Sequence, residues 1–427
     1  MIKPILFLQE TQIAELFKQN FKNGDFLKAI AFSFDENSVF HVYTKNVPQK
    51  TSSKQYVCYI QFVSTQDIQS TNSLVISNLI KQLLIKNSKE SFLIISLAID
   101  NNKLLNKASF VDDEKITFCE TKFIPKNNDL YSRAKGLIET DILKNKKVTI
   151  IGLGSGGSQI AIEFAKAGVG KYSLYDFDKL ELSNISRHIC GIDDIGRYKT
   201  FAVKDALLNK NPNAEIETYE IDINEDIEKF RNTIKDTDLI ICATDTTRSR
   251  FNVNQVSVSF NIVSLFGRAI TRAAGGDILR VRPKIGPCLN CLFGQGIIGK
   301  EDEEYSQVRQ IKQELPAYTS EDDIQTLIQV GLSSDILPIS IMMVKLGLVE
   351  LSRGEESGIN SLEDDLIADF YIWANRRERI YSKWPKMEYN FNKQTILRWY
   401  GAKVNKDENC TVCGLNYNTS SKENIFR

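Results

Sequence analysis

The chain has 427 residues, of which 42% are hydrophobic, so it is long enough for two domains with buried cores. Its 54 basic residues balance its 54 acidic residues, which removes the electrostatic motive for extended contact with nucleic acid or an anionic membrane. The sequence shows neither a signal-peptide pattern nor an apolar run long enough to span a bilayer, and we therefore expect a cytoplasmic protein.

Residues 1–128 are predicted to form a smaller accessory domain of α/β or α+β type. A helical pattern at residues 13–21 leads into strand-like runs, and a second helical pattern at residues 73–85 precedes further strands. The predicted strands cover residues 29–34, 39–43, 56–63, 92–99 and 118–123. His41 stands alone in one of them, which is more typical of a structural residue than of a metal ligand. A short polar linker, residues 125–129, follows.

The second domain, residues 129–427, opens on an apolar strand that runs into the pattern Gly152-x-Gly154-x-x-Gly157 and then into a helical pattern. Glycines allow the backbone to approach a phosphate closely, and a helix N-terminus favours its negative charge. A second strand ends in Asp176, 19 positions after Gly157, where a carboxylate reaches a ribose hydroxyl. The stretch therefore predicts a nucleotide site.

The glycine pattern by itself is shared by ATP-using enzymes and dinucleotide dehydrogenases. Asn184 and Arg187 follow the second strand, and Lys199 lies a little farther on, so an amide and two cations can converge on a polyphosphate. Asp245 follows a later strand, at the edge where open α/β sheets bind ligands, and a carboxylate there can hold Mg²⁺ against the phosphates. These residues favour ATP over NAD.

Strands and helices alternate through residues 148–265, which indicates a Rossmann-like, mostly parallel sheet with helices on both faces. A glycine pair at residues 275–276 turns the chain, and we expect an antiparallel extension of the sheet at residues 278–282. The domain is completed by a helix at residues 337–351 and late strands at residues 370–373 and 396–400.

Four of the eight cysteines form two CxxC pairs, Cys288/Cys291 and Cys410/Cys413. In a reducing cell, such pairs indicate one tetrahedral zinc site with four cysteine ligands rather than disulfides. More than a hundred residues separate the pairs, so two independent turns or redox pairs remain an alternative.

Three segments together resemble the ThiF/MoeB group of ubiquitin-activating-enzyme-like adenylyltransferases. They are DFDxxxxSNxxR from Asp176 to Arg187, GRYK from Gly196 to Lys199, and ATDxxxxR from Ala243 to Arg250. The resemblance covers residues 130–414 and implies ATP-dependent adenylation of the C-terminal carboxylate of a ubiquitin-like (β-grasp) protein that ends in glycine. The acyl adenylate would pass to a sulfur donor or a conjugating enzyme, as in bacterial ubiquitin-like pathways.

The resemblance also implies the role of each site residue: ribose binding by Asp176, phosphate binding by Asn184, Arg187 and Lys199, and Mg²⁺ binding by Asp245. Arg133, shortly before the first strand, would cross a symmetric homodimer interface and touch the phosphates of the neighbouring subunit. A structural zinc bound by the two CxxC pairs would link the C-terminal tail to the rest of the domain. The polar region at residues 294–334 would be a crossover loop over the substrate's tail.

This chain departs from the group in one respect. Members that hand their substrate to a conjugating enzyme place a cysteine in or near the crossover loop, and none occurs here between Cys291 and Cys410. Cys190, three positions after Arg187, is the candidate nucleophile that remains, because nearby cations would lower its pKa. Cys242 ends an apolar strand and is expected in the core.

Three other functions stay open. The chain could activate a small molecule, a peptide or tRNA; it could be an NAD-dependent oxidoreductase, which the phosphate ligands disfavour; or it could be a scaffold without activity, which would predict a lost phosphate ligand. The accessory domain faintly resembles a JAB/MPN peptidase, and with His41 as its one histidine it would be an inactive copy used for binding or assembly.

Overall fold

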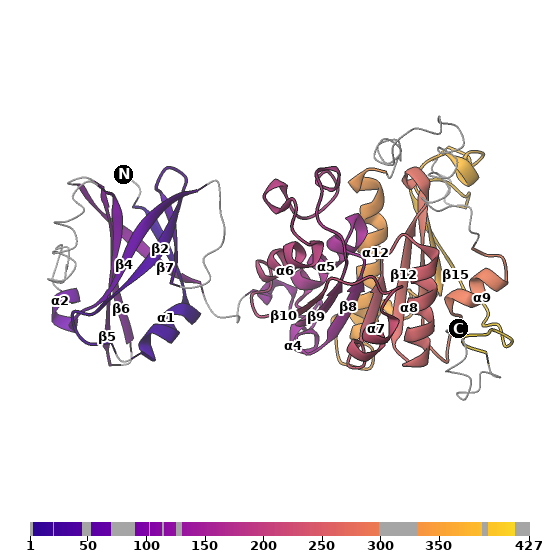
Figure 1. The fold of residues 1–427 in the computed structure, drawn as a ribbon, viewed down its shortest axis with the longest axis horizontal. Coiled ribbons are helices and arrows are strands. Elements are labelled where there is room, and N and C mark those ends of the chain that lie inside the picture. The colour runs from indigo at the N-terminus through magenta and orange to yellow at the C-terminus, as the bar shows by residue number, and fades with distance from the viewer. Residues whose placement is uncertain are drawn as a thin grey trace. The chain divides into compact units, whose positions relative to one another are not determined.

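The computed structural model describes residues 3–19, 21–44, 53–69, 90–101, 103–112, 115–124, 130–298, 331–386 and 392–414. The chain divides into two compact units, Met1–Leu130 and Tyr131–Arg427 (Figure 1). The predicted helix at residues 73–85 lies outside the described residues, as does most of the predicted crossover loop. None of the helices in the described ranges is long and apolar enough to cross a membrane.

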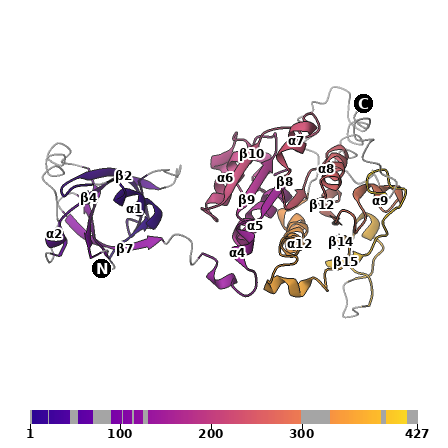
Figure 2. The same ribbon diagram turned by 90° about the horizontal axis from the view of Figure 1, so that it is seen from below.

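The N-terminal unit is a closed barrel of seven strands in the order β1-β3-β2-β4-β5-β6-β7, in which β7 pairs with β1 (Figures 1 and 2). The strands are Ile5–Gln9 (β1), Phe26–Phe34 (β2), Val39–Tyr43 (β3), Lys54–Phe62 (β4), Phe92–Asp100 (β5), Lys103–Asp112 (β6) and Lys115–Ile124 (β7). Two described helices accompany them, Glu10–Phe17 (α1) and Thr65–Gln69 (α2). Because the strands form one closed sheet rather than alternating with helices, the described residues fit the α+β alternative and not the α/β one.

Alternate side chains of the barrel strands point inward and fill its interior. Leu6, Phe40 and Ile60, for example, are fully buried. His41 lies between two buried residues of β3 and stacks on Phe7, with ring centroids 5.0 Å apart. It belongs to an aromatic cluster, as expected of a structural histidine, and the resemblance to a JAB/MPN fold stays a hypothesis.

The second unit is built on an eight-stranded sheet in the order β10-β9-β8-β11-β12-β13-β14-β15. Strands β8 to β12 pair in parallel and the last three join antiparallel, which confirms the predicted sheet and its antiparallel extension. The strands are Lys147–Ile151 (β8), Lys171–Tyr175 (β9), Glu215–Tyr219 (β10), Leu239–Cys242 (β11), Val263–Ala269 (β12), Gly275–Val281 (β13), Phe370–Ala374 (β14) and Arg398–Ala402 (β15).

Helices cover both faces of this sheet (Figure 2), and each face has its own apolar core. One core contains residues of Ser155–Ala167 (α5), Lys199–Leu208 (α6) and Ser333–Leu351 (α12). The other contains residues of Ile227–Thr233 (α7), Thr247–Ser259 (α8) and Leu289–Gly294 (α9). The central strand β8 is buried along its whole length, as expected where both faces are covered.

Candidate functional site

The glycine pattern forms the turn between β8 and α5. Gly152 has a φ of +83°, and a Cβ there would lie 2.8 Å from the carbonyl oxygen of Ala243. A Cβ on Gly157 would lie 1.8 Å from the carbonyl oxygen of Gly152. Gly154 differs, because a Cβ there would meet no atom of the described residues within 4 Å. The fold itself needs the first and third glycines, whereas the second borders open space that a ligand can enter.

Gly154 is also the N-cap residue of α5, a helix of 13 residues. None of the described side chains caps this helix, although the first N–H groups of a helix have no intrahelical acceptors. These donors and the positive end of the helix dipole therefore remain available to an anion at the turn.

Asp176, directly after β9, is fixed beside this turn. Its carboxylate accepts hydrogen bonds from the N–H of Leu153 (2.7 Å) and from the N–H of Asp178 (2.9 Å). Burial raises the pKa of Asp176, while the charge of Lys199 and the two hydrogen bonds act in the opposite direction. Each carboxylate oxygen has a second lone pair, so the residue can still accept from a ribose hydroxyl.

Lys199 begins α6 and is only 8% exposed. Its Nζ donates to the carboxylate of Asp178 at 2.7 Å, and its backbone N–H donates to the carbonyl of the same residue at 3.0 Å. Asp178 is half exposed, whereas the ammonium is nearly buried. The positive charge of Lys199 is therefore held in place close to Asp176.

Asn184 and Arg187 lie in a segment that is fastened to the glycine turn. The Oδ1 of Asn184 accepts from the N–H of Glu181 at 3.0 Å and closes the short 3-10 turn Leu182–Asn184, which leaves its NH2 group for a ligand. The carbonyl of Arg187 accepts from the hydroxyl of Ser155, the first residue of α5, at 3.1 Å. Both side chains are partly buried.

Sequence reasoning missed His188, which lies next to Arg187. Its Nε2 is 2.8 Å from the carbonyl oxygen of Leu153, inside the glycine turn, and its ring is buried. The position directly after a predicted phosphate ligand was a signal for this residue, but the partner in the turn could be found only in the structure.

Asp245 is exposed in the turn between β11 and α8. The next residue, Thr246, caps α8 by accepting from the N–H of Ser249 at 3.2 Å. Arg250 is 7% exposed and donates to the carbonyl of Thr244 at 2.6 Å, so it supports the turn that presents Asp245. An exposed carboxylate at this edge fits Mg²⁺, which commonly binds one or two carboxylates together with substrate phosphates.

Arg133 is exposed on the 3-10 turn Ser132–Ala134. The neighbouring Tyr131 donates its hydroxyl hydrogen to the carbonyl of Ala165, near the end of α5. At 1.5 Å per residue, that anchor lies about 15 Å along the helix from the glycine turn. The structure of one chain thus does not bring Arg133 together with the other predicted phosphate ligands.

Cys190 requires a correction. It is 5% exposed, and burial together with the charge of Asp194 raises its pKa to about 12, against the opposing charge of Arg197. The prediction that nearby cations lower this pKa is wrong, because desolvation of a buried thiolate outweighs them. Cys242 is fully buried, as predicted.

The two CxxC pairs meet in space, so the alternative of two independent turns is excluded. The sulfurs of Cys288, Cys291, Cys410 and Cys413 all lie within 4.8 Å of one another. Three of the Sγ to Sγ distances are 3.9, 3.6 and 3.4 Å. With Zn–S bonds of about 2.3 Å, the sulfurs of a tetrahedral site lie about 3.8 Å apart. The four cysteines could therefore hold a zinc ion.

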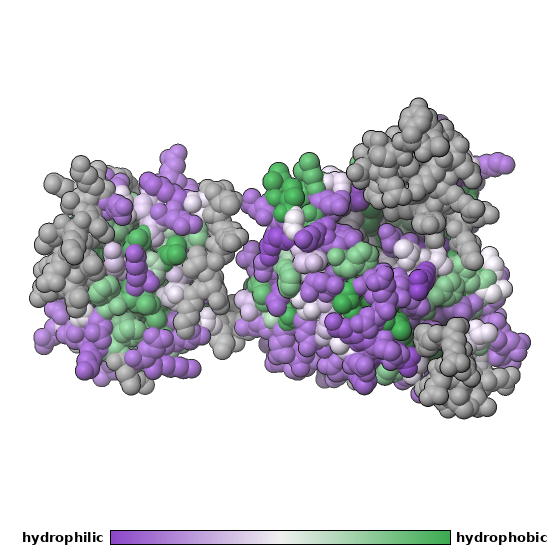
Figure 3. All heavy atoms as spheres, viewed as in Figure 1, coloured by the Kyte–Doolittle hydropathy of each residue, from purple (hydrophilic) through white to green (hydrophobic). Residues whose placement is uncertain are grey.

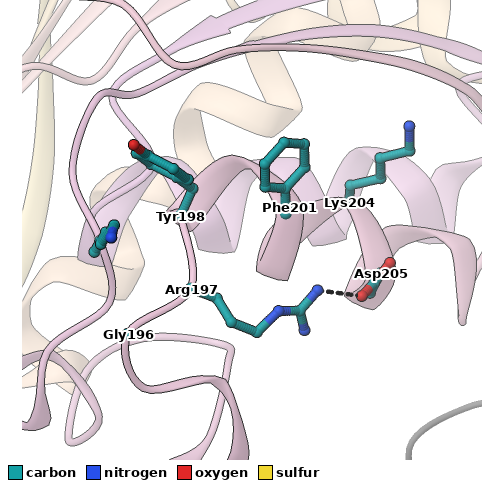
Figure 4. A pocket seen from close by; sticks show the side chains of 7 residues that line it. Gly196, Arg197, Tyr198, Phe201, Lys204 and Asp205 are labelled. Atoms are coloured by element: carbon teal, nitrogen blue, oxygen red, sulfur yellow. Dashed lines mark hydrogen bonds and ion pairs between the residues drawn. The ribbon is translucent and has the colours of Figure 1, made fainter.

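An open pocket of about 480 Å³ lies beside the start of α6 (Figure 4). It is lined by Lys179, Gly196, Arg197, Tyr198, Phe201, Lys204 and Asp205, none of which is a predicted nucleotide ligand. Arg197 pairs with Asp205 at 2.5 Å. The pocket therefore borders the predicted site without containing it.

Large apolar side chains are exposed around the same segment, and Figure 3 shows hydrophobic residues gathered on the loops above α5 and α6. The exposed large apolar side chains within residues 177–201 are Phe177, Leu182, Ile192, Ile195, Tyr198 and Phe201, which we call the apolar surface. Contiguous exposed apolar patches often mark an interaction site.

The sequence model of the ThiF family matches residues 130–346, slightly more than half of the chain. The chain therefore belongs to the ThiF family. The matched range contains the glycine turn and all the predicted nucleotide ligands.

Among curated proteins, ubiquitin-like modifier-activating enzyme 5 of Drosophila melanogaster is 30% identical over 177 residues, which cover 38% of this chain and 44% of that protein. Adenylyltransferase and sulfurtransferase UBA4 of Scheffersomyces stipitis is 27% identical over 218 residues, 48% of each chain. This chain thus spans less than half the length of these relatives. Among solved structures, E. coli MccB with ATP is 17% identical, with a TM-score of 0.48 over 67% of this chain and 75% of that chain.

Proposed function

We propose that this chain uses ATP to adenylate the C-terminal carboxylate of a ubiquitin-like protein that ends in glycine. The observation that carries the proposal is the glycine turn, which is open at Gly154 and bordered by Asp176 and Lys199. Membership of the ThiF family and the names of the curated relatives, which are modifier-activating enzymes and an adenylyltransferase, support the same activity.

The reaction needs positioning and charge neutralisation more than acid or base catalysis. A carboxylate oxygen of the substrate forms a bond to the α-phosphorus of ATP, and the bond from that phosphorus to the bridging oxygen breaks to release pyrophosphate. The attacking group is already an anion, so no proton must be removed. The protein must orient the two reactants and stabilise negative charge on the phosphates.

The site residues divide this work. Asp176 would accept from the ribose hydroxyls, while the N-terminus of α5, Arg187 and Lys199 would neutralise the phosphates, with the amide of Asn184 as a further donor. Lys199 is pre-positioned by Asp178, so little side-chain freedom is lost when a phosphate binds. Asp245 would hold Mg²⁺, which shields the charge of the leaving pyrophosphate.

A homodimer would complete the site, because Arg133 follows Tyr131, whose hydroxyl is anchored near the far end of α5 in its own chain. The apolar surface supports this proposal, since a second copy of the chain would cover it. In such a dimer, Arg133 of each chain reaches the phosphates held by the other.

We further propose that the four cysteines bind a structural zinc that ties residues 410–413 to α9 and takes no part in the chemistry. A reducing compartment such as the cytoplasm would keep the thiols available for the metal. The acyl acceptor would be external, a sulfur donor or a conjugating enzyme, because Cys190 is buried with a raised pKa. The N-terminal barrel would serve binding or assembly.

The test is ATP–pyrophosphate exchange by the purified chain with Mg²⁺ and a ubiquitin-like protein that ends in glycine. We expect exchange that requires both the protein substrate and Mg²⁺. Asp245→Ala should lower the rate by at least about 100-fold, because one charge-stabilising contact is worth that much. Asp364→Ala, which removes an exposed carboxylate outside the predicted site, is the matched control and should leave the rate unchanged.

If Asp245→Ala leaves the exchange rate unchanged, Asp245 is not a ligand of the magnesium ion. If protein tails support no exchange but a small molecule, a peptide or tRNA does, the chain is an adenylating enzyme with a different substrate from the one proposed. A folded protein that supports no exchange with any of these carboxylates would contradict the proposed function itself.

A further inference from the structure

His188 makes two short contacts with backbone groups, and its side chain is 8% exposed. Its Nε2 lies 2.8 Å from the carbonyl oxygen of Leu153, the residue between the first two glycines of the turn. Its Nδ1 lies 3.1 Å from the backbone nitrogen of Cys190. The ring therefore joins the glycine turn to the segment that carries the predicted phosphate ligands.

Each contact admits only one role for the ring nitrogen that makes it. A carbonyl oxygen can only accept, so Nε2 must carry a proton and donate it. A backbone N–H can only donate, so Nδ1 must be unprotonated and accept. Together the two contacts define the neutral tautomer with its proton on Nε2. In an imidazolium, an Nδ1–H would face the N–H of Cys190, and a charge would be buried.

Leu153 is consequently held at both of its backbone groups. Its N–H donates to Asp176 at 2.7 Å, and its carbonyl accepts from His188 at 2.8 Å. The neighbouring Gly152 and Gly154 supply little conformational restraint of their own, because they lack a Cβ. These two side chains, one from each segment that borders the turn, therefore hold both peptide groups of Leu153.

We propose that His188 is a positioning residue of the nucleotide site, and that its neutral ring holds the glycine turn in the shape that receives a phosphate. Protonation of the ring would place an Nδ1–H against the N–H of Cys190, and this repulsion would displace the ring that holds the Leu153 carbonyl and weaken nucleotide binding at acid pH. This inference rests on the nucleotide-binding function proposed above.

The charges around the ring set the pH range of this effect. Burial lowers the pKa of His188 below its ordinary value of 6.5, and Lys199 on α6 and the adjacent Arg187 act in the same direction. The hydrogen bond to Leu153 and the charge of Asp194 oppose them. Because the pKa in the folded protein is the lower one, the contact of Nδ1 with the N–H of Cys190 is intact above 6.5 and is lost as the pH falls through the lowered value.

The experiment measures the affinity of the full chain for ATP with Mg²⁺ by calorimetry from pH 8 to pH 5.5. His188→Gln places an amide that does not titrate within reach of Leu153, and His188→Leu removes both hydrogen bonds. His41→Gln is the matched control, because the chain has only these two histidines. Thermal unfolding of each variant shows whether it is folded.

We expect the affinity of the wild-type chain to fall more than that of His188→Gln over this range, by a factor below about ten because the pKa of the ring lies below 6.5, since the ring must be neutral to make both contacts. Ionisation of the terminal phosphate of ATP affects both proteins alike, so the difference isolates His188. His188→Leu should bind about tenfold more weakly than the wild type at pH 8, because the Leu153 carbonyl loses its partner. His41→Gln should follow the wild-type profile.

Parallel profiles of the wild type and a folded His188→Gln would overturn the proposal. The tautomer is tested separately by long-range ¹H–¹⁵N correlation on labelled histidine, with His188→Gln to assign the signals. A proton on Nδ1 at pH 7.5 would also overturn the proposal. A folded chain that binds no ATP at any pH, yet shows the Nε2–H tautomer, would instead defeat the proposed nucleotide function.

Discussion

In the N-terminal unit, seven strands pair until β7 meets β1, so the sheet has no free edge and its interior is filled by alternate side chains. In the second unit, the parallel strands β8, β9 and β11 all end at one edge of an open sheet. Each runs directly into a polar turn, at Gly152, Asp176 and Asp245 respectively. Parallel pairing therefore gathers residues that are far apart in sequence, which the closed barrel does not do.

Under the proposed function, the second unit would carry out the chemistry and the first would have a structural or binding role. Substitutions at the open edge of the sheet should lower the adenylation rate and leave the stability of the barrel unchanged. Substitutions in the barrel should change its stability and leave the adenylation rate unchanged.

The largest effect is expected from Gly157→Ala. The new Cβ would lie 1.8 Å from the carbonyl oxygen of Gly152, so the turn must move, and exchange activity should fall below about 1% of wild type. The matched variant Gly154→Ala has room for its Cβ and should unfold at the wild-type temperature, yet bind ATP more weakly because the methyl occupies the ligand's space. Calorimetry and thermal unfolding test both; equal ATP affinity in Gly154→Ala and wild type would show that no phosphate enters there.

The next effect concerns the proposed exchange of Arg133 between subunits. Arg133→Ala and Lys199→Ala should each lower the exchange rate by about 100-fold, because each removes a positive side chain that would neutralise the phosphates. When the two variants are mixed and allowed to re-form dimers, half of the dimers contain one intact site, so about a quarter of the wild-type activity should return. A mixture no more active than its components would show that Arg133 acts within its own chain or not at all.

A smaller effect, on stability rather than on the chemical step, is expected from Cys410→Ser. Loss of one of four sulfur ligands should remove the zinc from the chain and lower the unfolding temperature of the second unit by about 10 °C. Cys119→Ser, in the barrel, is the matched control and should retain the metal. Metal content by elemental analysis decides the matter, and an equal zinc content in both variants would contradict the site.

The smallest effect is expected from His41→Phe in the barrel. His41 stacks on Phe7 and makes an edge-to-face contact with Phe34, with ring centroids 5.0 and 5.4 Å apart, so a phenyl ring should keep the packing and change the free energy of unfolding by less than about 1.5 kcal/mol. The exchange rate should not change. A large loss of exchange would mean that the barrel contributes to catalysis, and the division of labour between the two units would have to be abandoned.

Local patterns were sufficient to predict the order of elements in the second unit. The five parallel strands and the turn at Gly152 to Gly157 follow from apolar runs, glycine spacing and helical periodicity, all of which act over a few residues. In the barrel, the sequence indicated five of the strands but missed β1 and β6, and nothing local reveals that β7 closes on β1. Closure depends on pairing between the two ends of the domain.

Residue types and spacing by themselves determined which groups could bind a nucleotide or a metal: the glycines, Asp176, Lys199 and the two CxxC pairs. Only the tertiary structure decided how these groups are held. It brought together sulfurs separated by more than a hundred residues, buried Cys190 so that its pKa rises, and placed His188 against Leu153. Burial and the geometry of long-range contacts are properties of the packed chain, and no short stretch of sequence encodes them.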